Sequence, residues 1–411
     1  MQFVYNFVAL ISWFFLKAVA LFNPKIRLFV QGRKNVIPTL KNAISGSDEI
    51  IWVHVASLGE FEQGLPIMEK LRTEFPTYKI LVSFFSPSGY EIKKDTRVAD
   101  LTTYLPIDTA KNATLFLEFA RPKLAIFIKY EIWPNYLKEL NKRQIPTILA
   151  SAIFKQNQIY FKWYGGFMRD TLRTFSHIFL QDDSSARLLE SIGIKNTTVS
   201  GDTRLDRVSE ILERDNRLSF LEQFKKNRLC FVAGSTWPED EAILVDYINN
   251  APKGLKYVLA PHKIENNKIL GLTGAISKKT VRYSKFDENT IADFEVLIID
   301  HIGLLTKIYS YADIAYVGGG FATGLHNTLE PAVFGIPVIV GPNYHGFKEA
   351  EDLVAKKGIL SVADSFQFSE LMKKLLDDVG LRSKSGTINA SYISKNKGAS
   401  IQIIEYIRKL L

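Results

Sequence analysis

The chain has 411 residues, of which 46% are hydrophobic, and a formal net charge of +9. This length and composition exclude a disordered or fibrous protein and are typical of a globular protein with two domains. The positive charge favours an anionic partner such as an acidic membrane surface or a phosphorylated substrate, but the basic residues are scattered, so no nucleic-acid partner is predicted.

The first predicted element is an apolar helix over residues 1–22, MQFVYNFVALISWFFLKAVALF. At about 100° per residue, Gln2, Asn6 and Lys17 fall in one narrow sector, which fits a helix in or on a membrane. Basic residues follow directly: Lys25, Arg27, Arg33 and Lys34. They predict that the remainder stays on the cytoplasmic side, and the lack of a preceding positive charge argues against a cleaved signal peptide. An ordinary buried helix is the alternative.

Apolar runs of strand length then alternate with helical patterns, which is typical of a parallel sheet covered by helices on both faces. In the first half, the predicted strands lie at 50–56, 79–85, 124–130, 145–151 and 177–181. The predicted helices lie near 61–74, 109–120, 134–143 and 184–192. We expect a Rossmann-like domain over residues 23–208.

A polar, charged stretch at 209–228 interrupts this alternation, which then restarts. The second set of predicted strands lies at 229–235, 255–261, 295–300, 313–319 and 336–341. They predict a second Rossmann-like domain over 209–411, whose last segment either caps this domain or crosses back to the first. The single cysteine, Cys230, lies in an apolar run and is expected to be buried, which excludes a disulfide framework and indicates a reducing compartment.

Ligands of open parallel sheets bind beyond the carboxyl ends of the strands. With two such sheets, we expect the site in a cleft between the domains, lined by residues that follow strands.

Glu60 follows the strand predicted at 50–56, at the turn into a helix that is expected to begin near Phe61. A carboxylate at this point could act as a general base in the cleft. The spacing from Ser57 to Glu60 also matches a capping box, which would stabilise the helix by about 1 kcal/mol. The residues by themselves leave both interpretations open.

Glu131 and Arg204 lie at comparable positions. Glu131 directly follows the strand predicted at 124–130 and precedes Pro134, so it could be a first-turn carboxylate or a second acidic group in the cleft. Arg204 lies near the predicted domain boundary, where its fixed charge could meet a phosphate or a carboxylate.

In the second half, the segment AGSTWPEDE at 233–241 leads from a strand through small residues into a helix. This pattern predicts that backbone N–H groups and the hydroxyls of Ser235 and Thr236 point at an anion. His262 and Lys263 follow the next strand and could pair with a phosphate. Each of these residues could also have a purely structural role.

The stretch GGGFATGLHNTLEPAVFGIPVIVGP at 318–342 puts glycines and a glutamate between two strand-like runs. We expect a helix that begins near Asn327 and offers its N–H groups to a phosphate, with Glu330 accepting hydrogen bonds from ribose hydroxyls. A dinucleotide-binding fingerprint fits poorly, because the spacing is GxGxxxG and the next strand ends in glycine.

No metal site is predicted. Asp182 and Asp183 precede serines and a helix, which favours helix capping. The six histidines show no HxxxH or HxH spacing, and the sequence lacks both a GxxxxGK[ST] and a GxSxG motif.

In combination, these segments resemble the lipopolysaccharide Kdo transferases, membrane-associated enzymes that transfer 3-deoxy-D-manno-octulosonic acid (Kdo) from CMP-Kdo to a lipid A precursor. The resemblance covers almost the whole chain, from the apolar helix to the last strand. It is carried, in order, by HVASLGE, SPSG, EIWPN, SGDTRLD, AGSTWPEDE, APHK, IGLL and YADIAYVGGGF running into HNTLEPAVFGIPVIVGP.

The resemblance implies an α/β fold of the GT-B type, with the acceptor on the first domain and the nucleotide on the second. It implies inverting transfer without a metal or cofactor, at the cytoplasmic side of the inner membrane, to a lipid IVA-like acceptor. Glu60 matches the general base, and Glu131 and Arg204 match residues that stabilise the transition state. The residues predicted to bind CMP-Kdo are Ser235, Thr236, Pro261, His262, Lys263, Ile302, Gly303, Leu304, Gly320, Asn327, Thr328, Leu329 and Glu330.

The sequence departs from the family pattern at several positions. Leu325 and Thr328 stand where the family commonly has glycine and proline, and Ile153 replaces an arginine. An arginine common before the histidine of the APHK turn is also absent, which leaves His262 and Lys263 to supply the charge. Two other functions stay open: a related sugar transferase or epimerase that uses a UDP-sugar, and a non-catalytic protein that binds membrane surfaces.

Overall fold

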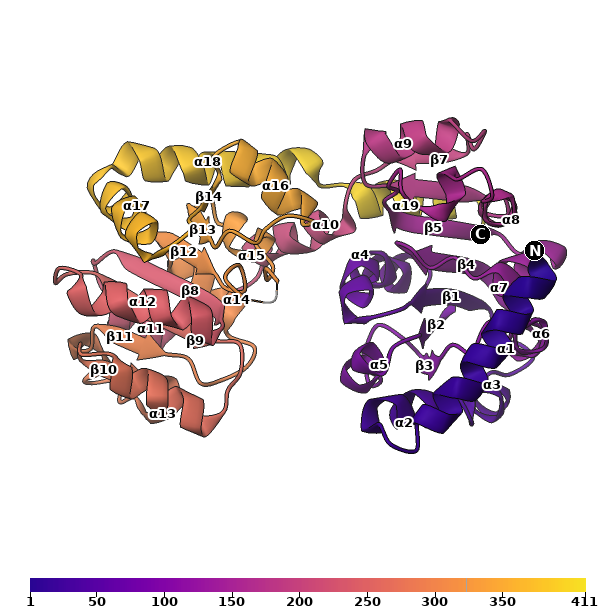
Figure 1. The fold of residues 1–411 in the computed structure, drawn as a ribbon, viewed down its shortest axis with the longest axis horizontal. Coiled ribbons are helices and arrows are strands. Elements are labelled where there is room, and N and C mark those ends of the chain that lie inside the picture. The colour runs from indigo at the N-terminus through magenta and orange to yellow at the C-terminus, as the bar shows by residue number, and fades with distance from the viewer. Residues whose placement is uncertain (323) are drawn as a thin grey trace. The chain divides into compact units, whose positions relative to one another are not determined.

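The computed structural model describes residues 1–322 and 324–411 (Figure 1). The chain divides into two compact units. Unit 1 consists of Met1–Arg207 and Lys397–Leu411, and unit 2 consists of Val208–Asn396. Within the described residues, each unit is built around a seven-stranded sheet, and the paired strands run parallel.

The sheet of unit 1 has the strand order β3-β2-β1-β4-β5-β6-β7. Its strands are β1 (Ile50–Val55), β2 (Lys79–Phe84), β3 (Leu101–Tyr104), β4 (Pro122–Ile128), β5 (Thr147–Ala152), β6 (His177–Leu180) and β7 (Thr197–Val199). Successive residues of β1 point to opposite faces: Trp52 belongs to one hydrophobic cluster, and Ile51 and Val53 belong to another. Because both faces are covered, β1 is buried along its whole length.

The helices of unit 1 cover both faces of this sheet (Figure 1). They are α1 (Gln2–Val19), α2 (Pro24–Gln31), α3 (Val36–Ala43), α4 (Leu58–Glu74), α5 (Pro87–Lys93), α6 (Ala110–Ala120), α7 (Pro134–Lys142), α8 (Gly166–Leu172), α9 (Asp183–Glu190) and α19 (Ala399–Ile407). Helix α10 (Thr203–Ser209) begins in unit 1 and ends in unit 2. The last helix, α19, returns to unit 1 and buries Ile403, Ile404 and Ile407 in its core. Asp206 accepts hydrogen bonds from the backbone N–H groups of Gly398 and Ser400, which fixes the start of α19.

The sheet of unit 2 has the order β10-β11-β9-β8-β12-β13-β14. Its strands are β8 (Cys230–Thr236), β9 (Lys256–Pro261), β10 (Thr280–Arg282), β11 (Val296–Ile298), β12 (Ile314–Val317), β13 (Val338–Val340) and β14 (Ile359–Ser361). Its helices are α11 (Ser219–Lys225), α12 (Pro238–Asn250), α13 (Asn266–Ala275), α14 (Leu305–Ile308), α15 (Leu329–Ala332), α16 (Lys348–Ala355), α17 (Ser365–Asp377) and α18 (Val379–Asn396).

The predicted α/β architecture is confirmed, and each predicted strand corresponds to an observed one. Cys230 is buried in β8, and burial raises the pKa of its thiol to about 12. Two helix starts differ from expectation. The helix expected near Phe61 already begins at Leu58, and the helix expected from Asn327 is the single turn α15, whose N-cap is Thr328.

Among the described residues, α1 is the one helix that is long and apolar enough to cross a membrane. None of its residues is buried, and Phe3 and Phe14 are 81% and 72% exposed, so it is not an ordinary core helix. Polar side chains of α1 form hydrogen bonds with the rest of unit 1. Tyr5 donates to Asp108 at 2.7 Å, and Asn6 accepts from Asn135 at 2.9 Å. The apolar remainder of α1 is thus the surface that can meet lipid.

Candidate active site

Glu60 lies in the first turn of α4, beyond the end of β1. Its Oε2 atom accepts the backbone N–H groups of Ala56 at 2.6 Å and Ser57 at 3.0 Å, while Ser57 Oγ accepts the Glu60 N–H at 3.5 Å. The predicted capping box is therefore confirmed. Both of these backbone bonds are made to Oε2.

The pKa of Glu60 is raised above its ordinary value, chiefly because the carboxylate is desolvated by burial and also because Glu131 carries a like charge. The N–H of Ala56 and the charge of Lys129 act in the opposite direction. The two predicted acidic residues thus lie within electrostatic reach of each other in unit 1.

Glu131 follows β4 and is only 8% exposed. Its Oε2 atom accepts a hydrogen bond from Trp133 Nε1 at 2.8 Å and lies 3.0 Å from His54 Nε2. Since α7 begins at Pro134 and has no acidic residue in its first turn, the alternative of a first-turn carboxylate is wrong. His54 and Trp133 were not predicted.

Arg204 is the second residue of α10. Its Nε and Nη2 atoms donate to Asp202 Oδ2 at 2.9 and 2.6 Å. Tyr130 lies within electrostatic reach of both Glu60 and Arg204. Burial and, next, the charge of Glu60 raise the pKa of the Tyr130 hydroxyl, whereas the charge of Arg204 lowers it. Glu60, Glu131 and Arg204 therefore share one region of unit 1.

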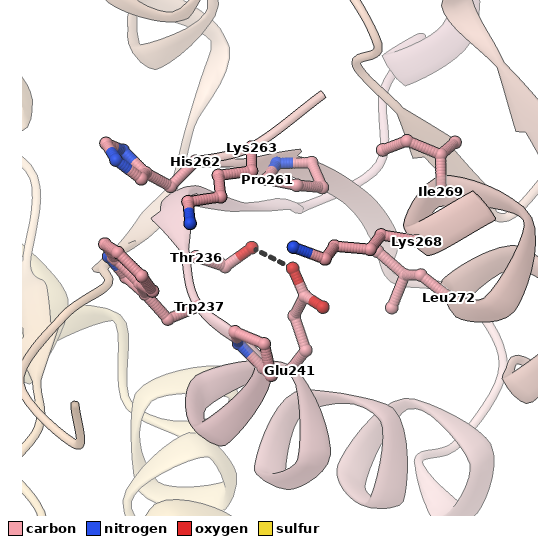
Figure 2. A pocket seen from close by; sticks show the side chains of 10 residues that line it. Thr236, Trp237, Glu241, Pro261, His262, Lys263, Lys268, Ile269 and Leu272 are labelled. Carbon is pink, nitrogen blue, oxygen red and sulfur yellow. Dashed lines mark hydrogen bonds between the residues drawn. The ribbon is translucent and has the colours of Figure 1, made fainter. Parts of the chain in front are cut away.

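In unit 2, a pocket lies between the N-terminal parts of α12 and α13, as Figure 2 shows. Its lining residues are Thr236, Trp237, Pro238, Glu241, Pro261, His262, Lys263, Lys268, Ile269 and Leu272. Thr236 Oγ1 donates to Glu241 Oε1 at 3.0 Å, so its hydroxyl hydrogen is used inside the protein. Ser235 has a φ of 55°, an uncommon conformation for a residue with a side chain.

Three aromatic rings stack at the edge of this pocket. The Trp237 ring lies on His262, with centroids 4.7 Å apart and an angle of 20°, and His262 lies 4.6 Å from His326. Trp237 Nε1 donates to His326 Nε2 at 2.8 Å, which places the proton of a neutral His326 on Nδ1. Burial is the main cause that lowers the pKa of both histidines. Trp237 and His326 were not predicted, although both lie in segments that carry the resemblance.

Asp240 ties the glycine-rich segment to the start of α12. Its Oδ2 accepts the N–H groups of Trp237 at 2.9 Å and Gly319 at 2.8 Å, and its Oδ1 accepts the Tyr316 hydroxyl at 2.6 Å. A Cβ on Gly320 would lie 2.7 Å from the backbone nitrogen of Gly341. Gly320 thus has a packing reason for being glycine, independent of any ligand.

Hydrogen bonds to Glu330 connect the two predicted nucleotide-binding segments, which follow β11 and β12. Glu330 accepts hydrogen bonds from Thr306 Oγ1 at 2.8 Å and from Asn327 Nδ2 at 3.1 Å. Thr306 follows the turn formed by Ile302, Gly303 and Leu304. Asn327 is exposed, whereas Thr328 and Leu329 are buried, so their side chains do not face solvent.

Metal ligands do not cluster in the part of the chain that the structure describes: no group of three or more His, Cys, Asp or Glu side chains could hold an ion. Asp182 caps α9 by accepting the Ser185 N–H at 2.7 Å, which confirms the capping interpretation.

The chain is similar in sequence to known proteins. Residues 29–207 match the family model of the 3-deoxy-D-manno-octulosonic-acid transferases (kdotransferase). The chain is 28% identical to the 3-deoxy-D-manno-octulosonic acid transferase of Haemophilus influenzae, over 90% of this chain and 89% of that one. It is also 28% identical to the enzyme of the same name from Aquifex aeolicus, over 86% and 95%.

Among solved structures, the UDP-GlcNAc 2-epimerase of Neisseria meningitidis bound to UDP-GlcNAc has a TM-score of 0.62 and 17% identity, covering 88% of this chain and all of that one. This likeness shows the fold. Two units, each with a parallel sheet covered by helices, have the GT-B-like architecture. Residues 29–207 are similar to the 3-deoxy-D-manno-octulosonic-acid transferase family, and the resemblance found in the sequence is confirmed.

Proposed function

We propose that the chain transfers Kdo from CMP-Kdo to a lipid IVA-like precursor of lipid A. The observation that carries this proposal is the family match over residues 29–207, since this segment contains Glu60, Glu131 and Arg204. Relatives named as Kdo transferases also match most of the chain, including unit 2.

In the proposed reaction, ionised Glu60 takes the proton from an acceptor hydroxyl. The hydroxyl oxygen then forms a bond to the anomeric carbon of Kdo, while the bond from that carbon to the CMP phosphate oxygen breaks and its electron pair leaves with CMP. Attack opposite the leaving group inverts the configuration. Desolvation makes Glu60 a stronger base, and a positioned base contributes about 10²- to 10⁴-fold to the rate.

The phosphate of departing CMP needs positive charge, which we assign to protein side chains rather than to a metal or cofactor. Lys263 and the His262 ring stand at the donor pocket, and Arg204 carries the fixed charge of unit 1. Trp237 offers an aromatic face and Glu330 offers carboxylate oxygens for ribose hydroxyls. These features support a nucleotide as the ligand of unit 2.

The acceptor is a lipid, and α1 supports membrane association. The exposed apolar side of α1, together with the net charge of +9, suits a membrane with anionic phosphorylated lipids. We assign the protein to the cytoplasmic side of the inner membrane, because basic residues directly follow α1.

The test is transfer itself. Purified full-length protein is incubated with CMP-Kdo and a tetraacylated lipid A precursor, and the lipid is weighed by mass spectrometry; we expect a gain of one or more Kdo units. Protection against unfolding by CMP but not by UDP would support the donor, and the reverse would favour a UDP-sugar enzyme. Loss of all transfer with retained membrane binding would instead favour a non-catalytic binding protein.

A further inference from the structure

We propose that His54 is a positioning residue for transfer: bonded to Ser83, it donates to Oε2 of Glu131 and so fixes this carboxylate with Oε1 directed to the substrate. The inference rests on the proposed function, because it concerns the role of Glu131 in that reaction.

His54 is fully buried in β1, on the side of the sheet that carries Trp52. Its ring centroid lies 5.6 Å from that of Phe127 and 6.1 Å from that of Trp133, both in edge-on contact. An imidazole in such apolar surroundings needs hydrogen-bond partners for both nitrogens, since an unsatisfied buried polar atom costs about 1–3 kcal/mol. Both partners are present.

The hydrogen-bond donors and acceptors define the direction of the chain of bonds. Trp52 Nε1 can only donate, and it lies 2.7 Å from Ser83 Oγ. With one lone pair of Ser83 Oγ engaged, its hydroxyl hydrogen can be donated to His54 Nδ1 at 2.8 Å. His54 then carries its proton on Nε2 and donates it to Glu131 Oε2 at 3.0 Å.

Glu131 receives a second bond at the same oxygen. Trp133 Nε1 donates to Oε2 at 2.8 Å. In this arrangement every N–H and O–H of the chain from Trp52 to Glu131 meets an acceptor. His54 Nδ1 also lies 3.1 Å from the carbonyl oxygen of Ser83, and Trp133 Nε1 lies 3.1 Å from His54 Nε2. A neutral ring with its proton on Nδ1 could use these two contacts, but its Nε2 lone pair would then face a lone pair of Glu131 Oε2 at 3.0 Å, which favours the tautomer with the proton on Nε2.

The titratable groups near His54 include the proposed base. Glu60, in the first turn of α4, lies within electrostatic reach of His54, Glu131 and Lys129. Burial and the negative charge of Glu131 raise the pKa of the Tyr160 hydroxyl to about 12. The imidazole therefore stands between the sheet and the carboxylates of the proposed site, where it can hold Glu131 without carrying a charge of its own.

The experiment compares His54→Gln with His54→Leu in the full chain. The glutamine amide can still donate to Glu131, whereas leucine cannot. For His54→Leu we expect kcat to fall about 10- to 100-fold, with the KM for CMP-Kdo within about twofold. We expect His54→Gln to recover part of this loss, because its amide restores the bond to Glu131. The matched control is His177→Gln, a histidine of β6 that bonds to Thr198.

Equal losses in both His54 variants, or an unchanged kcat in His54→Leu, would overturn the proposal. If His54→Leu does not fold, Ser83→Ala decides: it keeps the ring but removes the hydroxyl that orients it, and an unchanged kcat would be equally negative. Failure of the proposed function looks different, because the unmodified chain would then transfer no Kdo. Transfer by the unmodified chain with no effect of His54 would sink this inference alone.

Discussion

Ser57 and Glu60 bond to each other in both directions. The Ser57 N–H donates to the Glu60 carboxylate at 3.0 Å, and the Glu60 N–H donates to Ser57 Oγ at 3.5 Å. The residue proposed as the catalytic base is therefore also the residue that completes the capping box of α4. One substitution can affect stability and chemistry at once, so the two effects need variants that separate them.

Glu60→Gln should remove the base and keep the cap, because glutamine also completes a capping box. We expect transfer to fall about 10²- to 10⁴-fold with unchanged CMP-Kdo affinity. Ser57→Ala should do the opposite, with about 1 kcal/mol lost from the free energy of unfolding and most activity retained. Mass spectrometry of the lipid product and urea unfolding measure the two effects. Normal transfer by Glu60→Gln would remove Glu60 from the mechanism.

The raised pKa of Glu60 predicts how the free energy of unfolding depends on pH. Because the pKa is higher in the folded chain than in the unfolded one, the ionised carboxylate opposes folding. This cost is absent below the ordinary value of a glutamate and grows as the pH rises through the folded pKa. Glu60→Gln should therefore gain stability relative to the unmodified chain as the pH increases. Urea unfolding at several pH values checks this, and an advantage that shrinks with rising pH would contradict it.

Asp240→Ala should destabilise unit 2 by about 3–5 kcal/mol, because three buried donors lose their acceptor. Tyr316→Phe should cost less, about 1–2 kcal/mol, since the two N–H bonds to Asp240 remain. Glu239→Ala, an exposed neighbour on α12, is the matched control. The measurement is the free energy of unfolding in urea. A cost for Asp240→Ala no larger than that of the control would show that the contacts do not hold the segment.

Trp237→Ala should weaken CMP binding about tenfold, because the aromatic face on His262 is lost. Trp237→Phe keeps a ring but not the N–H that bonds to His326, so a smaller loss is expected. Isothermal titration with CMP measures both. Trp163, which is 91% exposed in unit 1, supplies the control Trp163→Ala. An equal effect of Trp163→Ala would place the nucleotide elsewhere.

Deleting residues 1–22 should release the protein from lipid vesicles while unit 1 stays folded. Asp108 keeps the N–H groups of Asn135 and Tyr136 after it loses the Tyr5 hydroxyl. Flotation with anionic vesicles and circular dichroism measure the two results. Phe3→Ser combined with Phe14→Ser retains the polar contacts of α1, so reduced flotation of this variant would identify its apolar side as the lipid contact. Continued flotation of the truncated chain would point to another surface.

The central strands could be predicted from the sequence, and the edge strands could not. β1 and β4 are covered on both faces, so each reads as a continuous apolar run. The strands that were not predicted are the edge strands of the two sheets: β3, β7, β10 and β14. They have only three or four residues and are partly exposed, which leaves no apolar run to recognise.

Glu60 and Glu131 could be found because each closely follows an apolar run. Their partners could not be found in the same way. His54 and Glu131 are 77 residues apart, and Asp240 and Gly319 are 79 residues apart. These pairs meet because β1 lies beside β4 and β8 lies beside β12. Neither segment indicates by its own sequence which strand will be its neighbour in the sheet.

By itself, the sequence determined the α/β class, the apolar helix at its start and the resemblance to Kdo transferases, because these depend on residue types and their spacing along the chain. Only the tertiary structure decided that Oε2 of each carboxylate is bonded within the protein, that a buried imidazole stands against Glu131, and that glycine at position 320 serves close packing. Such facts depend on distances between segments remote in the chain, and those distances arise only when the sheets form.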